Sequence, residues 1–140
     1  MTLGRRSFLT AAAFFLTLLP QSFGAETARR PAAAEVWVRT EVYFGSNKPH
    51  GEVTDAEFNS FIDSEVTPLF PDGLTLLTGA GQFKNSQGEL IREKSHLLIL
   101  LYPPQTQDAN RNIQFIRERY KKIHSQESVL RVDSFSFVSF

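Results

Sequence analysis

The chain has 140 residues, with 15 basic residues, 15 acidic residues and no cysteine. The absence of cysteine excludes disulfides, a thiol nucleophile and a cysteine zinc site. The even charge balance argues against nucleic acid as a partner, because binding a polyanion needs a basic excess on one face. This length supports one hydrophobic core and is too short for two.

The N-terminal segment has the three parts of a secretory signal peptide. Arg5 and Arg6 form a positive region, an apolar stretch runs over 9–19, and small residues precede the expected cleavage after Gly24. Residues 1–24 are therefore predicted to be a signal peptide, and the protein is expected to be periplasmic or secreted. Paired arginines before Ser-Phe-Leu match a twin-arginine signal, with an ordinary Sec signal as the alternative. The apolar stretch is shorter than the ~18 residues of a membrane span, so no stable span is expected after cleavage.

Cleavage changes the charge and leaves one domain. Arg5 and Arg6 are two of the 15 basic residues, so 13 remain against 15 acidic ones, a net charge of −2. Residues 25–34 have neither a strand nor a helix pattern and are predicted to be a linker. Residues 35–140 are predicted to form a single α+β domain, which must be held together by its core because no disulfide is available.

The domain begins with a strand of two different faces. Residues 36–44 alternate, so that Val42 points to one side while Arg39, Glu41 and Tyr43 point to the other. One face is therefore apolar, and the other carries charge and a phenol.

A helix and a hairpin follow. Thr54 and Glu57 have the spacing of a capping box, which predicts a helix start, and Pro68 ends that helix. Residues 74–84 and 89–102 have the pattern of two strands joined by a tight turn.

Two features mark this hairpin. The run 97–101 is apolar on both faces, which is typical of a strand in the middle of a sheet. Gly79 and Gly81 interrupt the preceding strand and predict a bulge or a close backbone approach.

A second helix and a fourth strand complete the domain. Asp108 is a candidate helix cap before an apolar stripe that runs to Ile123, and 128–134 is predicted to be a strand with an extended, aromatic tail. The order βαββαβ predicts a ferredoxin-like α+β fold, with a four-stranded antiparallel sheet, two helices on one face and the first and third strands at the centre. The core residues expected between sheet and helices are Val42, Phe58, Ile99 and Ile116.

The open sheet face is the candidate ligand site. Arginines there would recognise an anionic or carbonyl ligand, and a carboxylate or a histidine would serve as acid or base. The alternative is a ladder of salt bridges with little energetic consequence. The three histidines lack metal-ligand spacing, so neither a metal nor a cofactor is expected. The candidate residues are Arg39, Glu41, Tyr43, His96, Arg131 and Asp133.

Five segments of the domain form a distinctive set. They are R-T-E-V-Y-F-G at 39–45, V-T-P-L-F-P-D-G-L-T at 66–75, G-Q-F at 81–83, I-R-E-K-S at 91–95 and Q-E-S-V-L-R-V-D at 126–133. In order and spacing, over nearly the whole domain, these segments resemble the domain of unknown function 3574 family of small exported bacterial proteins. The resemblance implies the same domain and the same compartment, and it brings no settled activity or catalytic residues.

Two functions stay open at this point. The first is a periplasmic binding or interaction module that forms a homodimer through the open sheet face, because helices on one side leave apolar strand residues to cover. The second is a cofactor-independent enzyme of the dimeric α+β barrel type, acting on a small carbonyl or phenolic ligand. The expected partners are a second copy, a small molecule or an envelope protein.

Overall fold

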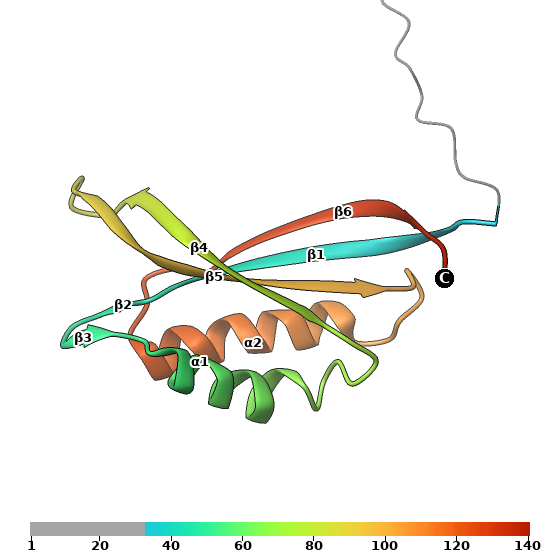
Figure 1. The fold of residues 1–140 in the computed structure, drawn as a ribbon, viewed down its shortest axis with the longest axis horizontal. Coiled ribbons are helices and arrows are strands. Elements are labelled where there is room, and N and C mark those ends of the chain that lie inside the picture. The colour runs from blue at the N-terminus through green and yellow to red at the C-terminus, as the bar shows by residue number, and fades with distance from the viewer. Residues whose placement is uncertain (1–32) are drawn as a thin grey trace, which may run out of the picture.

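The computed structural model describes residues 33–140, so the predicted signal peptide and the linker up to residue 32 lie outside the described residues. The described part has two layers, a four-stranded sheet and two helices that cover one of its faces (Figure 1). None of its helices is long and apolar enough to cross a membrane. The elements are β1 (Glu35–Gly45), β2 (Asn47–Lys48), β3 (Gly51–Glu52), α1 (Asp55–Phe61), the π-helical turn η1 (Ile62–Val66), β4 (Thr75–Lys84), β5 (Leu90–Tyr102), α2 (Ala109–His124) and β6 (Leu130–Val138).

The sheet has the strand order β4-β5-β1-β6, and every neighbouring pair is antiparallel. The first and third strands of the predicted pattern, β1 and β5, are therefore central. This arrangement confirms the predicted ferredoxin-like α+β fold.

The capping box at the start of α1 is confirmed. Thr54 Oγ1 accepts from the Glu57 backbone N–H at 3.2 Å, and Glu57 Oε2 accepts from the Thr54 backbone N–H at 2.8 Å. Glu57 Oε1 also accepts from Lys48 Nζ at 2.6 Å, which fastens β2 to the helix start. These bonds, with that from Lys48 the strongest, lower the pKa of Glu57 to about 2.

The start of α2 differs from the expectation. Asp108 is the N-cap residue with a left-handed φ of 62°, but its side chain makes no capping hydrogen bond and pairs with Arg111 at 2.9 Å. At the other end of the helix Ile123 is exposed and His124 is buried. The buried face of α2 therefore ends at His124, and Ile123, which the spacing placed on that face, lies outside it.

The register of β5 corrects one core residue. Val42 pairs with Leu98 on the helix side of the sheet, and Leu98 and Leu100 are fully buried. Ile99 therefore lies on the open face, and its predicted place in the core was wrong. The other expected core residues, Val42, Phe58 and Ile116, are buried together.

The β4–β5 hairpin contains no bulge. Gly79 pairs with Ser95 and Gly81 pairs with Glu93 in an unbroken register. The close approach is present instead, since a Cβ atom at Gly81 would lie 3.0 Å from Ser95 Cβ. Here the glycine gives room to a neighbouring strand and leaves the pairing intact.

Candidate functional site on the open sheet face

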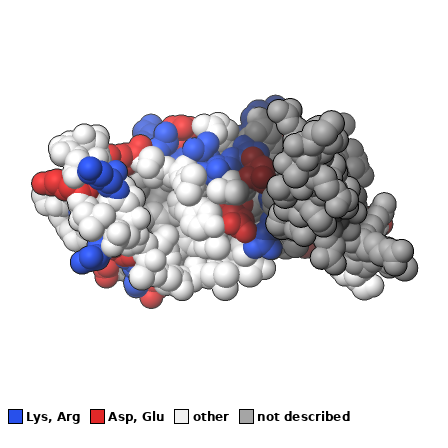
Figure 2. Space-filling view, turned by 90° about the horizontal axis from the view of Figure 1, so that it is seen from above, with Lys and Arg blue, Asp and Glu red and all other residues white. Residues whose placement is uncertain are grey.

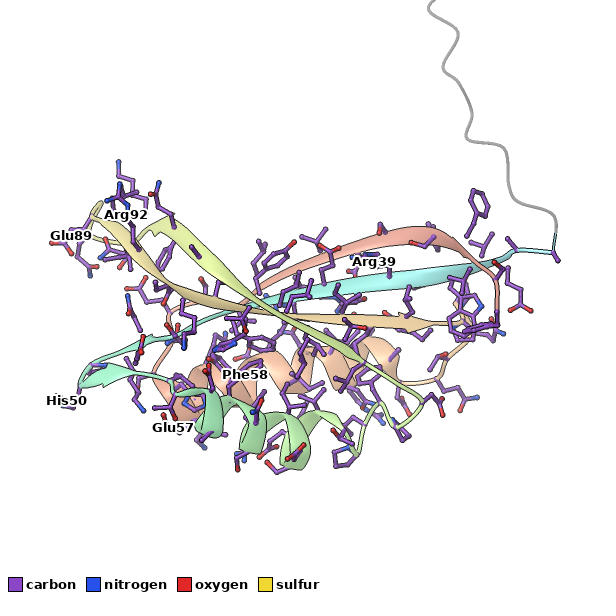
Figure 3. All side chains as sticks on the ribbon, viewed as in Figure 1. Arg39, His50, Glu57, Phe58, Glu89 and Arg92 are labelled. Carbon is purple, nitrogen blue, oxygen red and sulfur yellow. The ribbon has the colours of Figure 1, made fainter. Side chains whose placement is uncertain are left out.

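Three of the predicted site residues form a hydrogen-bonded chain on the open face. Arg39 donates from Nε and Nη2 to Glu41 Oε1 at 2.7 Å each, and Tyr43 OH donates to Glu41 Oε2 at 2.6 Å. They alternate along β1, so all three point away from the helices. Figure 3 shows Arg39 on the sheet and Phe58 beneath it, between the sheet and the helices. Both oxygens of the Glu41 carboxylate are thus occupied.

The contacts within this chain fix its protonation. The hydrogen bond from Tyr43, followed by that from Arg39, lowers the pKa of Glu41. The same bond to Glu41 raises the pKa of Tyr43. Glu41 is therefore a carboxylate and Tyr43 a phenol at neutral pH. Together with the guanidinium of Arg39, the three hydrogen-bonded side chains carry no net charge. A general base works best with a pKa near the operating pH, so this arrangement suits recognition better than proton transfer.

Apolar side chains flank the hydrogen-bonded residues Arg39, Glu41 and Tyr43 on both sides. Tyr43 pairs with Leu97 and Leu130 on the neighbouring strands, and Glu41 pairs in the same way with two β-branched residues. Leu130 is 58% exposed while Leu97 and Ile99 are partly buried, so the described residues leave part of this surface uncovered. Figure 2 views this face and shows a wide area without charged side chains. We call this surface the apolar band; it consists of Leu77, Leu97, Ile99, Leu101, Leu130 and Val132.

Arg131 and Asp133 were expected on the open face, and that placement was wrong. Arg131 pairs with Val42 and Asp133 with Thr40, so both belong to the helix side of the sheet. Asp133 Oδ1 accepts from Thr40 Oγ1 at 2.6 Å and from Arg131 Nε at 3.0 Å. Thr40 Oγ1 also lies 2.9 Å from the Tyr102 hydroxyl. These residues satisfy the polar groups of a buried part of the sheet.

His96 is the third residue that lies away from the open face. It pairs with Phe44 on the helix side and is 2% exposed. Its ring stacks on Phe58, and Nδ1 lies 3.2 Å from Thr78 Oγ1. Burial lowers the pKa of His96. The six candidates therefore divide into three on the open face and three behind it.

Glu93 is a site residue that sequence reasoning missed. It lies on the open face opposite Gly81 and lines a cavity of about 590 Å³ that Tyr43 also lines. The sequence signal for it is partial: the glycines at 79 and 81 predict a bulge or a close backbone approach, but they do not indicate which side chain lies beside them. Within residues 33–140, no three His, Asp or Glu side chains come together in a way that could hold a metal ion.

The fold and this face define a small α+β domain whose sheet is covered by helices on one side only. A family model described as "Protein of unknown function (DUF3574)" matches residues 39–140, and the chain belongs to that family. No curated protein matches the chain.

Two solved structures are similar in fold. A phage SAM lyase in complex with S-methyl-5'-thioadenosine has a TM-score of 0.58 at 14% identity, covering 74% of this chain and 90% of that chain. A phage SAM lyase in the apo state has a TM-score of 0.51 at 14% identity, covering 80% and 94%. At this identity the likeness shows the fold alone.

Proposed function

We propose that this protein is an exported binding module that associates with a second copy of itself through the open sheet face. The observation that carries the proposal is the apolar band, whose members Leu77 and Leu130 are each more than half exposed. The band flanks the polar residues of β1 on both sides, and exposed apolar surface of this kind marks interaction sites in soluble proteins. Covering it would complete a second hydrophobic layer on the sheet.

A second copy is the occupant that the charges of this face favour. The guanidinium of Arg39 is neutralised by Glu41 within the same face, so no unpaired charge is left on the β1 chain. The apolar band and this part of β1 can therefore be buried against a second copy without leaving an unpaired charge there, which is the costly outcome in an interface. Glu93, a carboxylate of the same face, lies beyond the band toward the hairpin. An interface built around a two-fold axis uses the same patch on both subunits and requires this self-complementarity.

The oligomeric state of the purified protein tests the proposal. Light scattering after gel filtration is expected to give a dimer mass for protein purified from cells that express the full chain. Leu101→Lys places a charge in the band beside Arg39 and is expected to give monomers. Phe115→Lys is the matched control, because Phe115 is exposed to a similar degree but lies on α2 in the helix layer. A monomeric wild type, or dissociation by the control alone, would contradict self-association.

An enzyme is the second candidate, and one observation favours it. The open face presents a guanidinium and a phenol, ordered by Glu41, beside apolar surface, and such a set suits a small carbonyl or phenolic ligand. The lowered pKa of Glu41 makes it a weak base, which places this candidate second. A ligand screen by NMR, with S-methyl-5'-thioadenosine included because the similar lyase binds it, would be compared between wild type and Glu41→Gln. Binding that Glu41→Gln abolishes would favour the enzyme.

A further inference from the structure

The cavity of about 590 Å³ lies at the hairpin end of the open face. Its walls come from the β4–β5 hairpin, from the end of β1 with the residues that follow it, and from the connection between α2 and β6. Figures 1 and 3 show this hairpin rising away from the helices, with Glu89 and Arg92 near its tip. The volume falls in the range of sites for small molecules.

The cavity exists because three small residues on neighbouring strands, Gly45, Gly81 and Ser95, form most of its floor. On the open side Gly45 pairs with Ser95, and Gly81 pairs with Glu93. Larger side chains rise on either side of this floor, among them Phe83 from the hairpin. The sheet therefore has a hollow where the rows of the apolar band end.

Glu93 is the carboxylate on this floor, and its position is fixed. Glu93 Oε2 accepts from the Asn47 backbone N–H at 2.7 Å. The carboxyl group lies directly over Gly45, where an added Cβ would be 2.8 Å from Glu93 Cδ. Among residues 33–140, no lysine, arginine or histidine forms an ion pair with Glu93. Its negative charge is oriented but not neutralised.

The other charged groups of the lining do not supply the missing cation. Lys48 is committed to Glu57 at 2.6 Å, and Glu57 is not part of the lining. Glu127 adds a second carboxylate, which accepts from Ser86 Oγ at 3.1 Å. Gln126 donates its side-chain N–H to the Asn47 carbonyl, so its amide oxygen stays available as an acceptor. The cavity therefore offers acceptors and an excess of negative charge.

We propose that this cavity binds a small organic cation, an ammonium group on an apolar body. Glu93 would be the counter-ion, and the rings of Tyr43 and Phe83 add faces that attract cations. The side chains of Ile91 and Leu130 would contact the apolar body. This site adjoins the apolar band on which the proposed self-association rests and shares Leu130 with it, but Glu93 and the rest of the cavity lining lie outside the band.

Three probes of similar size test the charge preference. 2-Phenylethylammonium, neutral 2-phenylethanol and anionic 3-phenylpropionate would be titrated into isotopically labelled protein purified from cells that express the full chain. The cation is expected to bind on the order of tenfold more tightly than the alcohol, as a charge-assisted contact predicts. The amide signals of Gly45, Gly81 and Ser95 are expected to shift. Equal affinity for cation and alcohol, or shifts confined to other residues, would overturn the proposal.

Two variants separate the charge from the shape. Glu93→Gln keeps an acceptor for Asn47 and is expected to remove the preference for the cation. Glu118→Gln is the matched control, because it makes the same change of charge on an exposed part of α2, and it should bind as wild type does. Phe83→Ala is expected to weaken cation and alcohol alike. An unchanged preference in Glu93→Gln, with folding verified by circular dichroism, would overturn the assignment.

The two proposals can fail separately. Leu101→Lys, designed to prevent self-association, lies outside the cavity lining and is expected to leave the binding of 2-phenylethylammonium unchanged. A loss of cation binding in that variant would show that the cavity depends on the dimer and would overturn it as an independent site.

Discussion

The imidazole of His96 stacks on the ring of Phe58, with the ring centroids 4.0 Å apart and the planes inclined by 10°. The His96 Nε2 atom is buried without a hydrogen-bond partner among the described residues, and the nearest Asp55 carboxylate oxygen is 3.9 Å away. The Nε2 atom of His124, on α2, is likewise buried without a hydrogen-bond partner among the described residues. Because protonation of such a ring would place a poorly solvated charge in the core, burial lowers the pKa of both histidines.

Acid is therefore predicted to destabilise the fold in the range where these histidines titrate. The unfolded chain protonates them near the ordinary pKa of 6.5, whereas the folded chain protonates them only at lower pH. Below pH 6.5 the unfolded state binds more protons, so the free energy of unfolding falls as the pH drops toward the folded pKa values. For His96 the charges of Asp55 and Glu52 partly oppose the shift, and Lys94 adds to it.

Urea denaturation between about pH 8 and pH 5 measures this effect. His96→Gln is expected to flatten the dependence, while His50→Gln, a change at an exposed loop histidine, is expected to leave it as in wild type. A free energy of unfolding that stays constant over this range would contradict the prediction.

A pair of neighbouring substitutions tests the register of β5. Leu98 is fully buried between sheet and helices, so Leu98→Ala is expected to cost about 2–5 kcal/mol. Ile99 lies on the open face and is only partly buried. Ile99→Ala should therefore reduce the free energy of unfolding less than Leu98→Ala does, when the protein is measured at a concentration low enough to keep it monomeric. The free energy of unfolding in urea compares the two. A larger loss for Ile99→Ala would reverse the assignment of faces.

Gly45 and Glu93 are predicted to be energetically coupled. In Gly45→Ala the new methyl group would displace the Glu93 carboxylate, the flexible end of its side chain, from the Asn47 N–H, so the variant is expected to lose that hydrogen bond and some stability. With Glu93→Ala in the background, the same substitution should be nearly neutral. A thermodynamic cycle of the two single variants and the double variant measures this coupling. Additive effects would show that the two residues do not compete for one space.

Removing either charge of the Arg39–Glu41 pair on the open face is predicted to change the free energy of unfolding little. Arg39 and Glu41 are partly exposed, with 35% and 22% of their side-chain surface accessible. Arg39→Gln and Glu41→Gln should therefore each change the free energy of unfolding by no more than about 1 kcal/mol. If this face holds a ligand, the same variants would lose binding while they fold normally. A loss of stability with no change in any ligand screen would mean that Arg39 and Glu41 have only a structural role, as a salt bridge.

Export is predicted to remove the N-terminal segment. Intact-mass measurement of protein from the periplasmic fraction should show the loss of residues 1–24. Replacing Arg5 and Arg6 together by lysine is expected to block export by the twin-arginine route. Unchanged export of that variant would favour the Sec route, and a full-length cytosolic species would contradict export altogether.

Alternation predicted the parts of the sheet where one face is polar and the other apolar. In β1 the contrast between Val42 and its neighbours Glu41 and Tyr43 fixes the two faces, and the structure has them as expected. In β5 the run around Ile99 is apolar on both sides, so its sequence contains no information on which residues face the helices. Only the pairing of Leu98 with Val42 determines which residues of β5 face the helices.

The site was less predictable than the fold for a related reason. Arg131 and Asp133 alternate with apolar residues in β6, and a shift of register by one residue moves such a set from one face to the other. The register is set by partners some ninety positions earlier, such as Thr40 opposite Asp133. The cavity at Glu93 could not be predicted from local sequence either, because it needs Gly45 of β1 and Gly81 of β4 to lie on opposite sides of β5.

The pairing of β1 with β6 constrains the order in which the sheet is completed. Glu35 pairs with Val138, so β1 gains its second set of hydrogen bonds only from a strand that lies far away in the sequence. The β4–β5 hairpin, by contrast, joins residues close in sequence and can form early. Until Leu130–Val138 docks, one long edge of β1 stays unpaired and open to other chains. Docking of β6 is thus the folding step that protects this edge from aggregation.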